Sequence, residues 1–99
     1  MIEIKVQSNL GKFVSLKVTG HANSAESGKD LVCSAVSAVV TGGFNAIKEV
    51  KNFSFVLEEG NAQLKSLGTI SSHDEVVIET MLTQLKTIAE TSPKFVKFN

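Results

Sequence analysis

The 99-residue chain is predicted to be a single α+β domain: a mainly antiparallel sheet in ββαββαβ order, with two helices packed on one face. Two observations predict this class. Segments in which apolar and polar residues alternate occur in neighbouring pairs, as strands of hairpins do, and each pair is followed by a longer segment with apolar residues at helical spacing. The length corresponds to one domain, 1–99, which is large enough for one modest core.

Strand periodicity appears in five segments of the chain: residues 2–6, 13–19, 53–57, 62–67 and 95–98. Turn residues at 8–12 join the first segment to the second, and the turn at 59–61 joins the third to the fourth, so both pairs are expected to be hairpins. Hairpins make the sheet mainly antiparallel. Its open face and edges need cover, which a homodimer would supply.

The first helix is expected to begin at Asp30 and to run to about Val50. Its predicted core stripe is Val32, Val36, Val39, Gly43, Ile47 and Val50. The pair Gly42-Gly43 weakens a helix by about 1 kcal/mol per glycine, so we expect a strand or partner backbone to approach closely there. The second helix is expected to start at a capping box formed by Ser72 and Glu75 and to end before Pro93. Its predicted stripe is Val77, Ile78, Met81, Leu82, Leu85, Ile88 and Ala89.

Composition indicates a cytoplasmic protein without nucleic-acid or membrane partners. Ten lysines balance ten acidic residues, which argues against a generally basic surface that follows phosphates but leaves room for a local basic patch. The single cysteine cannot form an internal disulfide and favours a reducing compartment. The N-terminus lacks the apolar run of a signal peptide, and no segment is long enough to span a membrane. No metal or other cofactor is expected, because no cluster of ligands accompanies His73.

The candidate chemistry lies between residues 20 and 37. Cys33 is expected in the first turn of the helix, where unpaired amides and the helix dipole favour a thiolate and could hold an oxyanion. His21 begins a polar loop that could fold back over this helix end and supply a base. Plainer interpretations stand beside this one: Cys33 as a small core residue, Asp30 as an N-cap for the amide of Val32 or Cys33, and Ser37 as a small packing residue.

The motif decides between these interpretations. Residues 20–37 match the pattern G-H-A-x5-G-x-D-x2-C-x2-V-S, formed by Gly20, His21, Ala22, Gly28, Asp30, Cys33, Val36 and Ser37. This pattern resembles the signature of the ribosomal-processing cysteine proteases of bacteria, and the similarity extends to chain length and element order. The resemblance implies a cytoplasmic homodimer that removes the N-terminal extension of the twenty-seventh protein of the large ribosomal subunit. It also implies that Cys33 is the nucleophile and His21 the general base, with supporting roles for Gly20, Asp30 and Ser37.

Two other function classes stay open at this stage: a non-catalytic ribosome-assembly binding factor and a thiol hydrolase of a small molecule. A binding factor would not need a thiol beside a histidine, and the neutral charge disfavours RNA as its partner. The small domain suggests an open groove that accepts an extended peptide, for example along a sheet edge. The loop at 22–29, with Gly28 as a hinge, is expected to order only when a ribosomal protein precursor fills several subsites.

Overall fold

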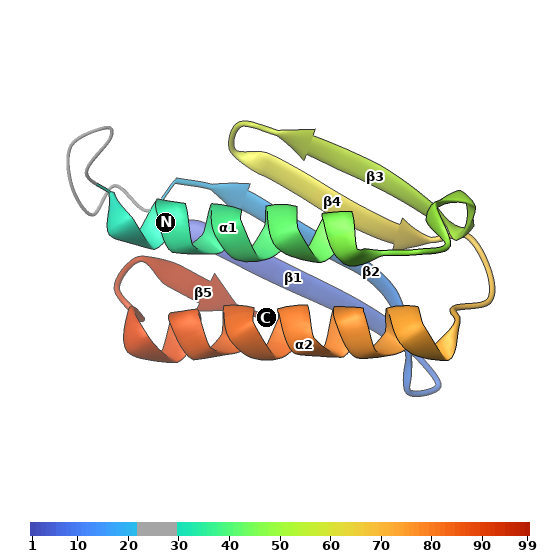
Figure 1. Ribbon diagram of the computed structural model, residues 1–99. Helices are drawn as coiled ribbons and strands as arrows, with labels where there is room; N and C mark the ends of the chain where they lie inside the picture. The colour runs from blue at the N-terminus through green and yellow to red at the C-terminus, as the bar shows by residue number, and fades with distance from the viewer. Residues whose placement is uncertain (22–29) are drawn as a thin grey trace.

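The computed structural model describes residues 1–21 and 30–99 and shows a sheet covered by two α-helices (Figure 1). In chain order the elements are β1 (Ile2–Asn9), β2 (Lys12–Gly20), α1 (Leu31–Ala46), the 3-10 turn η1 (Val50–Asn52), β3 (Phe53–Glu58), β4 (Asn61–Ser66), α2 (Ser72–Thr91) and β5 (Val96–Phe98). The α+β class and the ββαββαβ order are therefore confirmed. No helix in the described ranges is long and apolar enough to cross a membrane.

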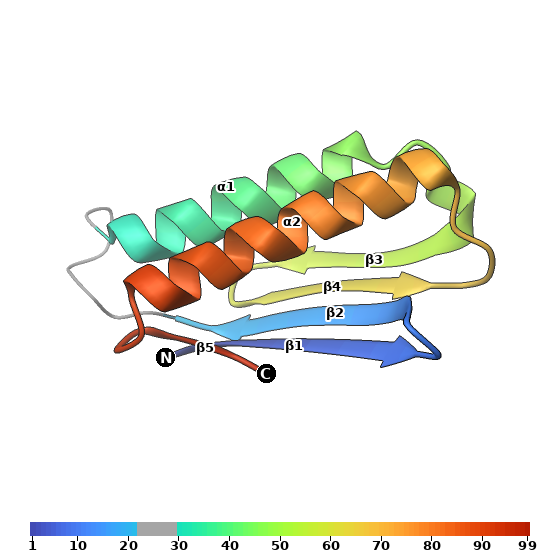
Figure 2. The same cartoon turned by 90° about the horizontal axis from the view of Figure 1, so that it is seen from below.

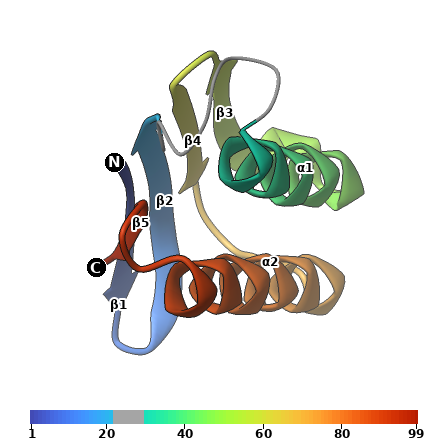
Figure 3. The ribbon, with the colours of Figure 1, turned by 90° about the vertical axis from the view of Figure 1, so that its left-hand side faces the viewer.

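The sheet has five strands in the order β3-β4-β2-β1-β5, and every neighbouring pair is antiparallel except β1 and β5. Both helices lie on the same face of the sheet, as Figures 2 and 3 show from two directions. The core fills the space between the two layers, and its most completely buried apolar side chains are Ile4, Leu16, Leu64, Met81 and Leu85. Strand alternation thus sends one set of side chains toward the helices and leaves the other set on an open face.

Helix α1 is shorter than predicted. It ends at Ala46, and Ile47 has an extended backbone with ψ of 129°. Of the predicted stripe, Val36 and Ile47 are buried, and Val32 and Val39 pack partly against the core. The helix also buries Val40 and Phe44. Val50 is 56% exposed, so placing it in the core was wrong. The helix stops because the next two backbone amides, those of Lys48 and Glu49, donate to a side chain of α2 instead of to helix carbonyls.

That side chain is Asp74, which sequence reasoning missed. Its oxygens accept from the amide of Lys48 at 2.9 Å and the amide of Glu49 at 3.0 Å, and His73 Nδ1 lies 3.0 Å away. Burial by itself raises the pKa of this carboxyl group. The hydrogen bonds from Lys48, His73 and Glu49, together with the charge of His73, outweigh burial and hold the pKa at about 2. Asp74 therefore ties the start of α2 to the segment that follows α1.

Two local expectations for the helices need correction. The N-cap of α2 is Ser71, whose Oγ accepts from the amide of Asp74, and not Ser72, which is the first helical residue. The close neighbour of Gly43 is a side chain of α2 rather than a strand or a partner backbone. A Cβ atom at Gly43 would lie 2.5 Å from Met81 Sδ, whereas a Cβ atom at Gly42 would meet nothing within 4 Å. Gly43 thus allows the two helices to approach each other closely.

Candidate active site

The N-terminus of α1 presents Cys33 in its first turn, as predicted. Asp30 is the N-cap, and its Oδ1 accepts from the amide of Cys33 at 3.0 Å. The predicted capping role of Asp30 is therefore confirmed. The cysteine is half-buried and packs against the edge of the core. This position gives the side chain a defined direction while leaving part of its surface accessible.

The cap changes one expectation about the oxyanion site. Among the first-turn amides expected to hold an oxyanion, that of Cys33 donates instead to the Asp30 carboxylate. The amides of Leu31 and Val32, which precede it in the same turn, also lack helix carbonyl partners by virtue of their position. These two amides are accordingly the better candidates for holding negative charge in this conformation.

His21 follows β2 directly and is held in place by its backbone neighbours. The carbonyl of His21 accepts from the backbone nitrogen of Met1, and the amide of Gly20 donates to the carbonyl of Gly60 at 3.0 Å. The imidazole lies against the turn between β3 and β4, because a Cβ atom at Gly60 would be 3.0 Å from His21 Nε2. The ring is exposed on its other side, so a substrate can reach it.

Gly20 is required for this arrangement of the backbone. Its φ of +94° is a conformation that side chains disfavour, and a Cβ atom there would collide with the carbonyl oxygen of Met1. The glycine therefore lets the chain leave the end of β2 with His21 in the cleft. This is a physical reason for glycine at the first position of the motif.

One cleft of about 240 Å³ brings four of the five predicted site residues together: Gly20, His21, Cys33 and Ser37. Its floor consists of apolar side chains from the strands and from α1, namely Ile2, Val18, Val36, Val40 and Ala62. Asp30 is not among the described residues that line the cleft, and it acts on the site through the helix cap. Ala22 and Gly28 of the motif, and the loop at 22–29 that was expected to act as a gate, lie outside the described residues.

The far wall of this cleft was not predicted from the sequence. It is formed by the end of β3 and the turn that follows, residues 57–61. Two glutamates, Glu58 and Glu59, belong to this wall and set its charge. Little in the sequence indicated this wall, because a Glu-Gly-Asn turn is common. The contact between Gly60 and His21 depends on the pairing of β2 with β4, which no local pattern predicts.

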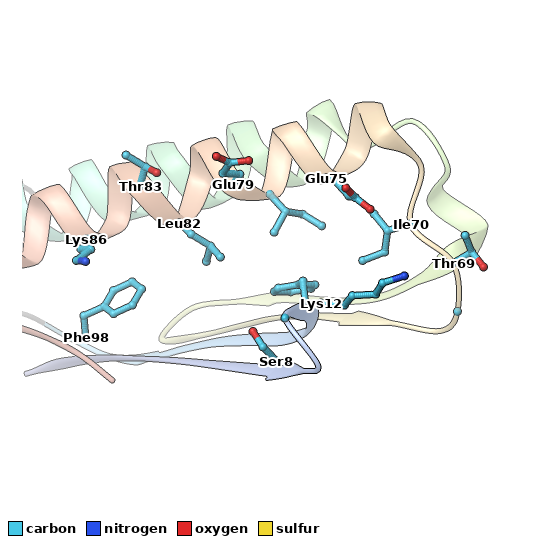
Figure 4. Close-up of a pocket in the computed structure, with 14 residues that line it drawn as sticks. Ser8, Lys12, Thr69, Ile70, Glu75, Glu79, Leu82, Thr83, Lys86 and Phe98 are labelled. Carbon is cyan, nitrogen blue, oxygen red and sulfur yellow. The ribbon is translucent and has the colours of Figure 1, made fainter.

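A larger cavity of about 780 Å³ lies at the other end of the strands, between α2 and the hairpin of β1 and β2 (Figure 4). Its walls include the apolar side chains of Ile70, Leu82 and Phe98, with Lys12 and Lys86 among the polar ones. Neither a cysteine nor a histidine is among the described residues that line it. Of the two cavities, the smaller one therefore contains the cysteine and histidine of the sequence motif.

Comparison with known proteins agrees with this geometry. The family model described as cysteine protease Prp matches residues 1–97. The chain belongs to the Prp cysteine protease family. The ribosomal processing cysteine protease Prp of Staphylococcus aureus strain Mu50 is 31% identical over 104 residues, covering 100% of this chain and 98% of that protein. The Prp of Bacillus subtilis strain 168 is 43% identical over 61 residues, which cover 61% of this chain and 54% of that protein.

Solved structures of the family have the same fold. The crystal structure of the essential S. aureus Prp with a covalently linked product peptide superimposes with a TM-score of 0.90 at 29% identity, covering 100% of this chain and 98% of that chain. The same S. aureus protease with a substrate peptide superimposes with a TM-score of 0.84. The predicted family membership is thus confirmed, and this chain is a thiol protease of the ribosomal protein processing type.

Proposed function

We propose that residues 1–99 form one catalytic domain that removes the N-terminal extension of the twenty-seventh protein of the large ribosomal subunit in the cytoplasm. The observation that carries this proposal is the shared cleft, which is lined by both a histidine from the end of β2 and a cysteine from the first turn of α1. Covalent chemistry is supported by the S. aureus relative, which was crystallised with a covalently linked product peptide.

The proposed reaction uses Cys33 and His21 as a dyad. His21 takes the proton of Cys33, and the thiolate attacks the scissile carbonyl. First-turn amides of α1 stabilise the resulting oxyanion. His21 then gives its proton to the departing amine, and water releases the acyl group from the cysteine. Asp30 holds the first turn in shape through its cap, while Ser37, one turn after Cys33, keeps the cleft wall small and polar.

The cleft suits an extended peptide. Its apolar floor can accept a hydrophobic side chain next to the scissile bond, and its opening borders β3, the edge strand of the sheet. An edge strand offers unpaired backbone groups with which a peptide can hydrogen-bond. A substrate that fills the floor and pairs with the edge would be held more tightly than a short generic peptide.

We also propose that the protein works as a homodimer. Helix α1 contains no charged residue over its sixteen positions, and the apolar side chain of Leu31 at its start is 79% exposed. Val76 on the outer side of α2 is 61% exposed, beside an apolar groove that includes Gly42. A second copy would cover this apolar surface. Sedimentation equilibrium at micromolar concentration should therefore give twice the chain mass, and a monomer would contradict the proposal.

The decisive experiment incubates the protein with the full-length ribosomal precursor and identifies the products by mass spectrometry. We expect one cut, which releases the extension. Cys33→Ala should abolish cleavage, and His21→Ala should slow it by about a hundredfold or more, the usual effect of losing a general base. His73→Ala is the matched control, because His73 lies at the start of α2 and away from the cleft; this variant should cleave like the wild type.

Three results would contradict the proposal. Equal cleavage by the His21 and His73 variants would show that the dyad is misassigned. Binding of the precursor without any cut by the wild type would favour the non-catalytic assembly factor. Turnover of small thioesters, with the precursor left intact, would favour the small-molecule hydrolase.

A further inference from the structure

The face of the sheet that points away from the helices carries a row of lysines. The register of the strands places Lys5 directly opposite Lys17, and Lys17 opposite Gln63 on the next strand. Lys65 lies two pairs further along, on the same face, opposite Ser15. Because paired residues point to the same side of a sheet, these side chains form one surface. We define the lysine face as the outward residues of the five strands: Glu3, Lys5, Gln7, Ser15, Lys17, Thr19, Ser54, Val56, Glu58, Asn61, Gln63, Lys65 and Lys97.

The lysine face concentrates positive charge in a chain whose net charge is zero. It carries four of the ten lysines and two of the ten acidic residues. Both acids, Glu3 and Glu58, lie in the row of pairs at the Gly20 end. The two rows nearer the β1–β2 hairpin hold Lys5, Lys17 and Lys65 and no acid. The charges of this protein are therefore segregated between its two layers.

These lysines are not neutralised within the protein. Lys5, Lys17 and Lys65 are exposed, and none of the ion pairs among residues 1–21 and 30–99 involves them. Like charges directly opposite each other on a sheet are destabilising. The pair of Lys5 and Lys17 thus opposes folding, and an anion bound between the two ammonium groups would remove this repulsion.

The other residues of the lysine face indicate which anion fits. Val56 is the one apolar residue of the set, and none of the set is aromatic. Protein–protein interfaces depend on buried aromatic or arginine anchors, and single-stranded nucleic acid is held by stacking on aromatic rings. The lysine face has no aromatic or arginine side chain, so neither a protein partner nor a single-stranded nucleic acid fits it well. Hydroxyl and amide side chains such as Ser15 and Gln63 stand between the lysines instead, and Ser15 Oγ already donates to Gln7 at 3.2 Å.

We propose that the lysine face binds the sugar-phosphate backbone of double-helical RNA. The lysines contact phosphates, and the hydroxyl and amide groups between them contact 2′-hydroxyls, which is how proteins hold RNA helices without reading sequence. The expectation of no nucleic-acid partner rested on net charge alone. Net charge does not show that positive side chains are concentrated on one face. Glu58 and Asn61 of this face also line the cleft, but none of its four lysines does, so RNA binding and cleavage are separate properties with separate tests.

The test measures the anisotropy of a labelled 20-base-pair RNA duplex with the full chain between 50 and 200 mM salt. Three to four phosphate contacts predict a slope of about −2.7 to −3.6 for the logarithm of affinity against the logarithm of salt, or a loss of roughly 40- to 150-fold over this range. Lys5→Gln and Lys17→Gln should each reduce the slope by about 1. Lys86→Gln, an exposed position on α2, removes the same charge from the other layer and should leave the slope unchanged.

Several results would overturn the proposal. These are no binding at 50 mM salt, an equal effect of Lys86→Gln and Lys17→Gln, and equally tight binding of a DNA duplex or of polyglutamate. All three variants should retain the wild-type melting temperature or exceed it, since removal of Lys5 or Lys17 relieves repulsion. If the Lys5 and Lys17 variants melt lower, the double variant Lys65→Gln/Lys97→Gln replaces them as the test, because these two residues are not paired with another lysine. An unchanged salt dependence of RNA affinity in this double variant would overturn the proposal.

Discussion

Replacing Asp74 by asparagine should destabilise the protein even though the two side chains have nearly the same shape. The carboxylate is fully buried and accepts from two backbone amides, those of Lys48 and Glu49. An asparagine side chain offers one oxygen and one amino group, so one of the two backbone donors loses its acceptor. An unsatisfied buried donor costs about 1–3 kcal/mol. We expect a loss of about 2 kcal/mol in the free energy of unfolding at neutral pH.

The pH dependence provides an independent estimate of the same quantity. The pKa of Asp74 is lowered from 3.8 to about 2 by its hydrogen bonds and by the charge of His73, against the opposing effect of burial. A carboxyl group whose pKa is lowered in the folded state stabilises that state above its unfolded pKa, and this stability is lost as the pH falls through the folded pKa. The contribution should therefore be complete above about pH 5 and decline between about pH 4 and pH 2. Its size is about 2 kcal/mol.

The assay is urea unfolding followed by far-UV circular dichroism between pH 2 and pH 7, because the chain has no Trp or Tyr to report by fluorescence. The gap between wild type and Asp74→Asn should be about 2 kcal/mol at pH 6 and should narrow toward pH 2, where about half of the folded wild-type protein carries a neutral Asp74. Glu75→Gln is the control, since it removes an exposed charge from the same turn. A gap that does not change with pH, or that is no larger than for Glu75→Gln, would refute the role assigned to Asp74.

Two further predictions concern α1. Gly42→Ala should raise the free energy of unfolding by about 0.5–1 kcal/mol through helix propensity. Gly43→Ala should lower it by about 1 kcal/mol or more, because the new methyl group meets the buried Met81. Similar effects of the two substitutions in urea unfolding would contradict this contact. Asp30→Ser should still cap the helix and retain both stability and precursor cleavage, whereas Asp30→Ala should cost about 1 kcal/mol. Loss of cleavage by a normally folded Ser variant would show that the carboxylate does more than cap.

The kind and order of the elements follow from patterns in the sequence. Period-2 and helical patterns are local properties of the chain, so they revealed all five strands and both helices, with ends displaced by a few residues. The same holds for the site. Its motif lies within eighteen consecutive residues, and the cap by Asp30 acts over three positions. Family resemblance assigned the roles of His21 and Cys33, which periodicity alone had left open.

Contacts between distant segments become visible only in the folded structure. Strand order and the parallel pairing of β5 depend on which edges meet, and no local pattern encodes that. The end of α1 depends on Asp74, which lies 26 positions after the amide of Lys48 that it binds. The same is true of the turn at Gly60 that supports His21 and of the opposed pair of Lys5 and Lys17. Each of these features is an interaction across the fold, and its energy exists only once the chain has folded.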